Sequence, residues 1–309
     1  MRGVWRLRRA WNRCFAHTIV LMYHRVGSPA SDPQLLSVSP RNFAEQLKVL
    51  RNRYFPIHLS QFANNRLLAM RPGSVVVTFD DGYADNLFNA KPILEEHEIP
   101  ATVFVTSGFV GSKQELFWDE LAGLLLPQDG PDWNVLMFGD PTPRHSEYRE
   151  LSTRLRWEQH GPRESILDDL TKHADVARLC RDSERPLNGP ELQELAQSPM
   201  IEIGSHTVTH PALAMLEPFD QRREMLDSKA SLEETTNCPV TALSYPFGTP
   251  KDYTDVTVRI ARECGYKCAC ANLPSRPTPF SNRYQIPRFI VRNWDGDEFA
   301  KQLRTFRER

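Results

Sequence analysis

The 309-residue sequence lacks long apolar runs, an excess of either charge and the dense cysteine pattern of a small disulfide-stabilised fold. The apolar run nearest the start, Ile19–Tyr23, is far too short to span a bilayer. A formal net charge of −1 gives no whole-chain argument for a nucleic-acid partner. With 40% hydrophobic and 25% charged residues, the composition is that of a globular protein with one large or two smaller α/β domains.

Residues 1–17 lack the apolar core and small-residue cleavage site of a secretory signal, so we expect a cytoplasmic location. The segment is basic, with arginines interleaved with large apolar side chains. Two interpretations stay open. The segment forms an amphipathic helix on an anionic membrane surface, or it forms a basic helix packed on the domain.

Six cysteines in a chain without an export signal are expected to be reduced thiols. Cys264, Cys268 and Cys270 are clustered, but their spacing matches neither a zinc ribbon nor a redox pair. We interpret them as small apolar fillers near one strand.

Strand and helix patterns alternate over the first 110 residues, which predicts a parallel sheet or barrel. The run Val75–Phe79 reads as a strand buried on both faces, and it leads into Asp80, Asp81 and Gly82. Neighbouring side chains on a strand point to opposite faces, but glycine permits backbone angles that break this alternation. Both carboxylates could then lean over one end of the sheet, where such folds bind ligands. The alternative is a simple turn with an Asp helix cap.

The alternation is lost from 111 to about 189, where prolines divide the chain into short pieces. We expect helices near 116–126 and 164–179 and a short strand at 133–138. This stretch is interpreted as a mixed helical insertion on one rim of a single domain that covers 18–309.

His206 and His210 follow another buried strand, and Pro211 disfavours a regular helix through them. Alone, such a pair is often coincidental or structural. Together with Asp81, it supplies a His-His-carboxylate set with open coordination positions, which hydrolytic zinc sites and non-haem iron oxygenases share. The second carboxylate, Asp80, favours a hydrolase, which needs a general base.

Thr78–Tyr83 and His206–His210 resemble the first two motifs of the polysaccharide deacetylases, carbohydrate esterase family four, with a nodulation-factor deacetylase-like domain. Ser244–Gly248 resembles the Pro-aromatic-Gly part of the third motif. The motifs occur in the order typical of the family, and the resemblance covers residues 18–300 apart from the insertion. It implies an α/β fold, a distorted (β/α)₇ barrel.

The resemblance also implies roles for individual residues. Asp80 is the general base, and the backbone N–H of Phe247 stabilises the oxyanion. A divalent metal, expected to be Zn²⁺ with Co²⁺, Ni²⁺ or Mn²⁺ as alternatives, is held by Asp81, His206 and His210. Tyr245 faces either the substrate or the interior of the barrel.

Two departures from the family pattern matter. The arginine that usually begins the third motif is replaced by Ser244, and no histidine follows His210 to serve as general acid. The first and last strands of a closed barrel are neighbours, so we hypothesise that His24 is the acid and that Arg288 pairs with the base. The alternatives are a hydrogen-bonded loop histidine and a surface ion pair.

The function implied is a metal-dependent hydrolase that removes N-acetyl groups from amino sugars of a polysaccharide or its glycan precursor, as in exopolysaccharide biosynthesis. The alternatives are hydrolysis of a non-sugar amide or cyclic imide, or a carbohydrate-binding relative with a weakened site. Three tryptophans either stack on sugar rings or pack at the rim: Trp118, Trp133 and Trp294.

Overall fold

The computed structural model describes residues 18–29, 31–64, 71–126, 143–174, 178, 180–278 and 280–307. The basic N-terminal segment 1–17 and the strand predicted at 133–138, including Trp133, lie outside these residues. Among the helices of the described part, none is long and apolar enough to cross a membrane.

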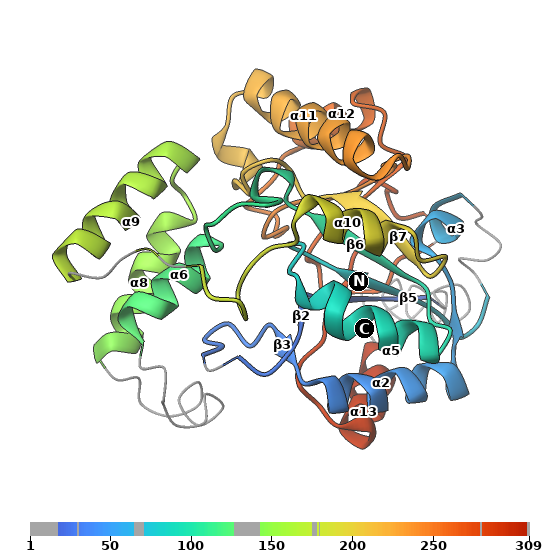
Figure 1. Cartoon of the computed structure of the whole chain (residues 1–309). Coiled ribbons are helices and arrows are strands. Elements are labelled where there is room, and N and C mark those ends of the chain that lie inside the picture. Colours follow the sequence, from blue (N-terminus) through green and yellow to red (C-terminus); the bar gives the residue numbers. More distant parts are fainter. Residues whose placement is uncertain are drawn as a thin grey trace, which may run out of the picture.

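A curled parallel sheet forms the centre of the fold (Figure 1). Its strands lie in the order β10-β1-β5-β6-β7-β8-β9. Their bounds are β1 Ile19–Tyr23, β5 Ser74–Phe79, β6 Ala101–Val105, β7 Ile201–Ser205, β8 Ala242–Ser244, β9 Cys268–Cys270 and β10 Phe289–Ile290. A short strand, β4 (Phe55–Pro56), pairs with the start of β5.

The two edges of this sheet approach each other through the segment that ends in β10. β10 pairs with β1, with Leu21 opposite Phe289. At the other edge, Cys270 of β9 forms an isolated parallel bridge with Ile286, just before β10. The first and last strands are therefore neighbours, and the predicted (β/α)₇ class is confirmed.

Helices connect the strands and cover the outside of the sheet (Figure 1). Several begin with capping side chains: Ser39 caps α2, and Asn188 and Glu191 form a capping box at α10. A π-helical turn, η1, directly precedes α5. The bounds are α2 Pro40–Arg53, α3 Leu59–Asn64, η1 Asn86–Ala90, α5 Lys91–Glu96, α10 Gly189–Ala196, α11 Pro218–Thr236, α12 Asp255–Glu263 and α13 Gly296–Phe306.

Between β6 and α10, the chain forms a helical lobe at one side of the barrel (Figure 1). It contains α6 (Phe117–Leu125), α8 (Pro143–Leu155) and α9 (His160–Ala174), close to the helices predicted near 116–126 and 164–179. These helices share a buried apolar cluster that also includes Tyr83 and Phe109 from the barrel loops. The lobe is thus packed onto the rim that follows β5 and β6. Short elements complete the chain: β2 Arg25–Val26, β3 Ser37–Val38, η2 Ser107–Phe109 and η3 Leu213–Met215.

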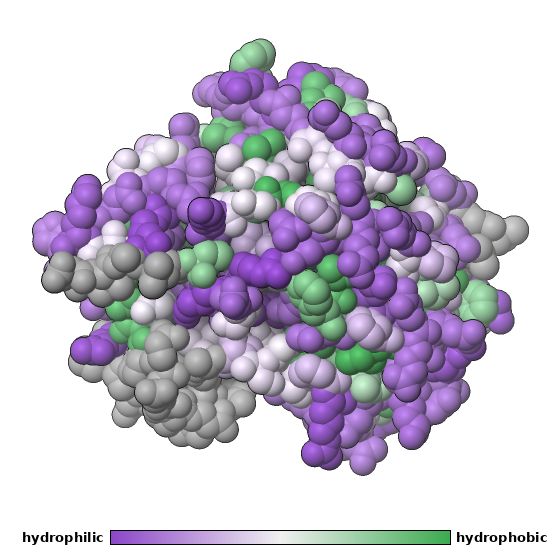
Figure 2. Space-filling model, viewed as in Figure 1, coloured by the Kyte–Doolittle hydropathy of each residue, from purple (hydrophilic) through white to green (hydrophobic). Residues whose placement is uncertain are grey.

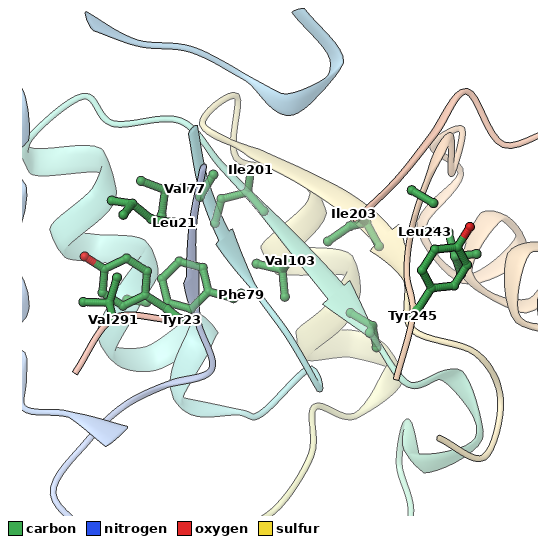
Figure 3. Close-up of a cluster of buried hydrophobic side chains, with 14 of the residues drawn as sticks. Leu21, Tyr23, Val77, Phe79, Val103, Ile201, Ile203, Leu243, Tyr245 and Val291 are labelled. Atoms are coloured by element: carbon green, nitrogen blue, oxygen red, sulfur yellow. The ribbon is translucent and has the colours of Figure 1, made fainter. Parts of the chain in front are cut away.

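Aliphatic and aromatic side chains from successive strands fill the core (Figure 3). Val77 and Leu243 are completely buried, and burial of such a side chain contributes about 1.5–3 kcal/mol. Cys264, Cys268 and Cys270 are free and buried among apolar residues, which confirms their interpretation as fillers. Hydrophilic residues cover most of the face seen in Figure 2.

Candidate active site

Asp80 and Asp81 follow β5, and both are buried, with 3% of their surface exposed. Asp81 has a φ of 79° and Gly82 a φ of 83°, so the strand alternation is broken at the predicted place. A Cβ atom on Gly82 would lie 2.9 Å from Val105 Cγ1, so this turn needs glycine for space as well as for conformation. Both carboxylates consequently line one cavity at the end of the sheet.

The two histidines lie in a loop directly after β7, and Thr207 and His210 have φ values of 67° and 55°. Glu224 of α11 holds this loop: its carboxylate accepts hydrogen bonds from the backbone N–H of Val208 (2.8 Å) and Thr209 (2.9 Å). It also accepts one from the Thr209 hydroxyl at 2.7 Å. Sequence reasoning missed Glu224, because one charged residue in a long helix carries no local signal for such a contact.

Asp81, His206 and His210 form the one group of three or more potential metal ligands found in the described part of the chain. The Nε2 atoms of His206 and His210 lie 3.4 and 3.5 Å from Asp81 Oδ1. His206 Nδ1 lies 2.8 Å from the carbonyl oxygen of Ser244, which fixes the proton on Nδ1 and leaves Nε2 as a lone-pair donor. The predicted ligands are thus brought together.

One atom of this group in particular fits a bound cation. Asp81 Oδ2 is buried without a hydrogen-bond partner among the described residues. A buried, half-satisfied carboxylate is costly unless a cation completes its interactions. Burial also lowers the pKa of His210 to about 4, so its imidazole is neutral at pH 7, as a metal ligand must be. The N and O donor set suits Zn²⁺ and related divalent ions.

Asp80 forms a buried bidentate ion pair with Arg288. The Nη1–Oδ1 and Nη2–Oδ2 distances are both 2.7 Å, and Arg288 is 1% exposed. The guanidinium also donates to the hydroxyls of Thr78 (3.0 Å) and Ser244 (2.8 Å). The Ser244 hydroxyl in turn donates to Asp80 at 3.2 Å. Arg288 therefore supplies the positive charge beside Asp80 that the neutral Ser244 cannot provide.

Electrostatics keep Asp80 ionised. Burial on its own would raise the pKa of this carboxyl, but the charge of Arg288 and its hydrogen bonds outweigh burial and hold the pKa below its usual value. Asp80 Oδ2 lies 4.0 Å from His206 Nε2, so an ionised carboxylate stands directly beside the ligand group. The arrangement can accept a proton from a water molecule placed between them.

A cavity of about 190 Å³ joins these groups. Its lining also includes His24, Trp118, Arg156, Phe247 and Arg292. The Trp118 ring meets His210 edge-on at 4.8 Å, and its Nε1 donates to the Tyr83 hydroxyl at 2.9 Å. Trp118 therefore forms a wall of the cavity, whereas Trp294 packs against the core.

His24 follows β1, is half-buried and lines the cavity. Its backbone carbonyl accepts a hydrogen bond from Asn86 at 2.9 Å, so its position is fixed by η1. Burial lowers the pKa of His24 below 6.5, the Asp81 and Asp80 carboxylates oppose this, and Arg288 adds to it. The role of His24 stays a prediction.

Phe247 adopts a left-handed conformation with a φ of 59°. In the described residues, no acceptor is present for its backbone N–H, which is therefore available to a ligand. Arg156, from the turn after α8, lies 4.4 Å above the Phe247 ring and forms an ion pair with buried Asp252. Asp252 also accepts from the Thr249 N–H at 2.8 Å, so Arg156 and Asp252 together hold this loop. Sequence reasoning did not find Arg156.

The substrate-facing prediction for the Tyr245 side chain is wrong. Tyr245 is 1% exposed and lies among core side chains (Figure 3). Its ring stacks on Tyr253 at 4.5 Å, and its hydroxyl donates to the carbonyl oxygen of Tyr284. A buried hydroxyl needs such a partner, and here that partner lies inside the fold.

Replacing Glu224 with glutamine should loosen the histidine loop, because a carboxamide has one acceptor oxygen for three donors. Changes to residues that support metal ligands cost about 10–100-fold in metal affinity, and we expect an effect of this size for Zn²⁺. Competition with a fluorescent chelator measures it. Glu234→Gln, on the exposed side of the same helix, is the matched control. Equal affinity in both variants would show that Glu224 does not position the ligands.

Comparison with known proteins gives a consistent result. The polysaccharide deacetylase family model matches residues 69–128 and 163–269, more than half of the chain. The interruption between these ranges falls inside the predicted insertion.

Protein YxkH of Bacillus subtilis (strain 168), provisionally named a polysaccharide deacetylase, is 24% identical over 93% of this chain and 76% of its own length. An Escherichia coli (strain K12) poly-β-1,6-N-acetyl-D-glucosamine N-deacetylase is 32% identical over 33% of this chain, which is 16% of that protein. The acetate complex of the Streptococcus pyogenes deacetylase PplD superimposes with a TM-score of 0.61 at 22% identity, over 93% of this chain and 98% of that one. That likeness establishes the fold, and the family match establishes more: the chain belongs to the polysaccharide deacetylase family.

Proposed function

We propose that this protein is a metal-dependent N-deacetylase that hydrolyses the acetamido group of amino sugars in a glycan or its precursor. The observation that carries the proposal is the joining, in one cavity, of an Asp-His-His donor set with an ionised carboxylate held by a buried arginine. Membership of the polysaccharide deacetylase family supports it. The ordered Asp80–Arg288 pair argues against a binding protein with a weakened site.

We assign the divalent ion to Asp81, His206 and His210, with Zn²⁺ preferred on the N and O character of the ligands. Three protein ligands leave open positions, as catalytic zinc sites do. When bound, the ion supplies Lewis acidity toward the amide carbonyl and lowers the pKa of water. A non-haem iron oxygenase shares this ligand pattern but has no use for Asp80 as a base.

The remaining steps fall to the protein's own groups. Asp80 accepts a proton from the attacking water, and Arg288 keeps Asp80 charged and oriented. The Phe247 N–H donates a hydrogen bond to the carbonyl oxygen as negative charge develops there. His24 donates the proton that lets the amine leave.

The proposed substrate is an N-acetylated glycan, in line with the name of the Escherichia coli relative. A cytoplasmic location and membrane contact through residues 1–17 stay predictions, because the described residues do not include that segment.

The enzyme loaded with Zn²⁺ or Co²⁺ should release acetate from oligomers of N-acetylglucosamine, and a chelator should abolish the release. Asp80→Asn should lower turnover about 10²–10⁴-fold with normal metal content, because it removes the base. His206→Ala should lose the metal itself, whereas His173→Ala, at an exposed position of α9, serves as the control. If the metal-loaded protein releases acetate from no acetylated glycan, the alternatives of a non-sugar amide substrate or a binding role gain support.

Replacing Arg288 should shift the acid limb of the pH profile of kcat/KM. The base works when ionised, so its low pKa extends activity toward low pH. In Arg288→Gln the effect of burial is no longer offset, the pKa of Asp80 rises, and the acid limb moves to higher pH. Arg288→Lys retains the charge and should keep the limb near its original position. An unchanged limb in the glutamine variant would contradict the role of Arg288.

The basic side of the same profile tests His24. A general acid must be protonated, and burial lowers the pKa of His24 below 6.5. As the pH is raised, the decrease in kcat/KM should therefore start at a pH lower than 6.5. His24→Gln should remove this limb and reduce turnover about 10²–10⁴-fold at normal metal content. Turnover near that of the unmodified protein would exclude His24 from the mechanism.

A further inference from the structure

The three arginines at the active site differ in how their charges are balanced. Asp80 neutralises Arg288, and Asp252 neutralises Arg156. Arg292 lines the cavity from the end of the last strand, and in the described part of the chain it has no acidic partner within 4.0 Å. Of the three arginines, only Arg292 therefore has no ion-pair partner among the described residues.

Part of the Arg292 side chain has a structural task. Its Nη1 donates to the carbonyl oxygen of Gln34 at 2.8 Å and also to that of Leu35. The adjacent strand is fixed by a 3.0 Å hydrogen bond from the Val291 N–H to the Met22 carbonyl. These contacts fix the orientation of the guanidinium, so little conformational freedom is left to lose on binding.

The other donors of Arg292 remain unused. Among the described residues, Nε and Nη2 have no partner, and neither atom is sealed from solvent. The one carboxylate whose charge acts on Arg292 is that of Asp32. Both oxygens of this carboxylate already accept hydrogen bonds, from the N–H groups of Leu36 and Ser37 at 2.8 Å. Burial lowers the pKa of Arg292 and the charge of Asp32 only opposes this, so the guanidinium lies where an added anion would stabilise it.

The sum of charges in the cavity points the same way. Two Asp–Arg pairs cancel, and a divalent ion on Asp81 leaves one positive charge. Arg292 adds another. A neutral N-acetylated sugar would leave the first charge uncompensated and the second opposed only by Asp32, which does not line the cavity. A glycan with an acidic group would match both charges.

We propose that Arg292 is the anion subsite of this enzyme, and that the substrate glycan carries a carboxylate or phosphate on the acetylated sugar or its neighbour. The planar guanidinium presents Nε and Nη2 as a fork that matches either group with two parallel hydrogen bonds. This inference rests on the proposed deacetylase function and narrows its substrate to acidic glycans.

The test uses pairs of substrates that differ only in charge. One pair is an oligosaccharide of N-acetylglucosamine alternating with glucuronic acid, and the same oligosaccharide with its carboxyl groups reduced to alcohols. The second pair is a phosphorylated N-acetylglucosamine oligomer before and after phosphatase treatment. The pair in which the charged member is turned over faster than its neutral partner shows whether the anion is a carboxylate or a phosphate. We expect kcat/KM for the charged member to exceed that of its neutral partner by about 10–100-fold.

Variants separate recognition from structural support. Arg292→Gln should bring the ratio of charged to neutral substrate close to one, and Arg292→Lys should give an intermediate ratio, because it keeps charge without the fork. Arg41→Gln, at a position with an 87% exposed side chain, should keep the ratio of the unmodified protein. If Arg292→Gln lowers both members of a pair equally, Arg292 only supports the loop at 34–35 and the proposal is wrong.

A failure of the inference can be told from a failure of the deacetylase proposal. Equal turnover of both members of both pairs leaves the deacetylase intact and overturns the anion subsite. If neither member releases acetate, calorimetric titration of the zinc-loaded Asp80→Asn variant gives their affinities directly. Tighter binding of the charged member, lost on adding Arg292→Gln, supports the subsite. Equal affinities contradict it.

Discussion

The buried ion pair between Asp80 and Arg288 is the interaction on which the rest of the site depends. Each charge is almost completely inaccessible to water, and an unpaired charge there would cost several kcal/mol. The pair joins the end of β5 to the start of β10, which are far apart in sequence but separated only by β1 in the sheet. Pairing therefore requires the curled sheet to bring its last strand next to its first.

The loops around this pair hold unusual backbone conformations. Asp81, Thr207, His210 and Phe247 all have positive φ values, which cost of order 1–3 kcal/mol each in residues other than glycine. Such conformations persist only when surrounding contacts fix them. Glu224 supplies these contacts for the histidine loop, and the Arg156–Asp252 pair supplies them for the Phe247 loop. The helical lobe between β6 and α10 thus reaches the candidate active site through Arg156.

The sequence predicted the features that leave a local or topological pattern. Buried strands show as apolar runs, and Asp81 and His206 follow directly from such runs, so their convergence at one end of the sheet could be expected. The position of Arg288 could be predicted because first and last strands are neighbours in a barrel. The contact of Glu224 with the histidine loop, by contrast, depends on how α11 packs, which no spacing records.

Other features needed three-dimensional information for similar reasons. From the sequence, the Tyr245 side chain could face the cavity or the core. Its hydroxyl finds a hydrogen-bond acceptor inside the core, the carbonyl oxygen of Tyr284, 39 residues later in the chain. Arg156 and Arg292 are ordinary basic residues in the sequence. Among the described residues, Arg156 forms an ion pair with Asp252, whereas Arg292 donates hydrogen bonds only to the carbonyl groups of Gln34 and Leu35.

The most direct test of the central claim is a crystal structure of the zinc-loaded protein with anomalous scattering data collected at the zinc absorption edge. We expect one strong anomalous peak about 2.0–2.2 Å from an oxygen of Asp81 and a nitrogen of each of His206 and His210, with Asp80 still paired to Arg288. A peak bound to other residues, or none at this group in protein shown to contain zinc, would contradict the assignment.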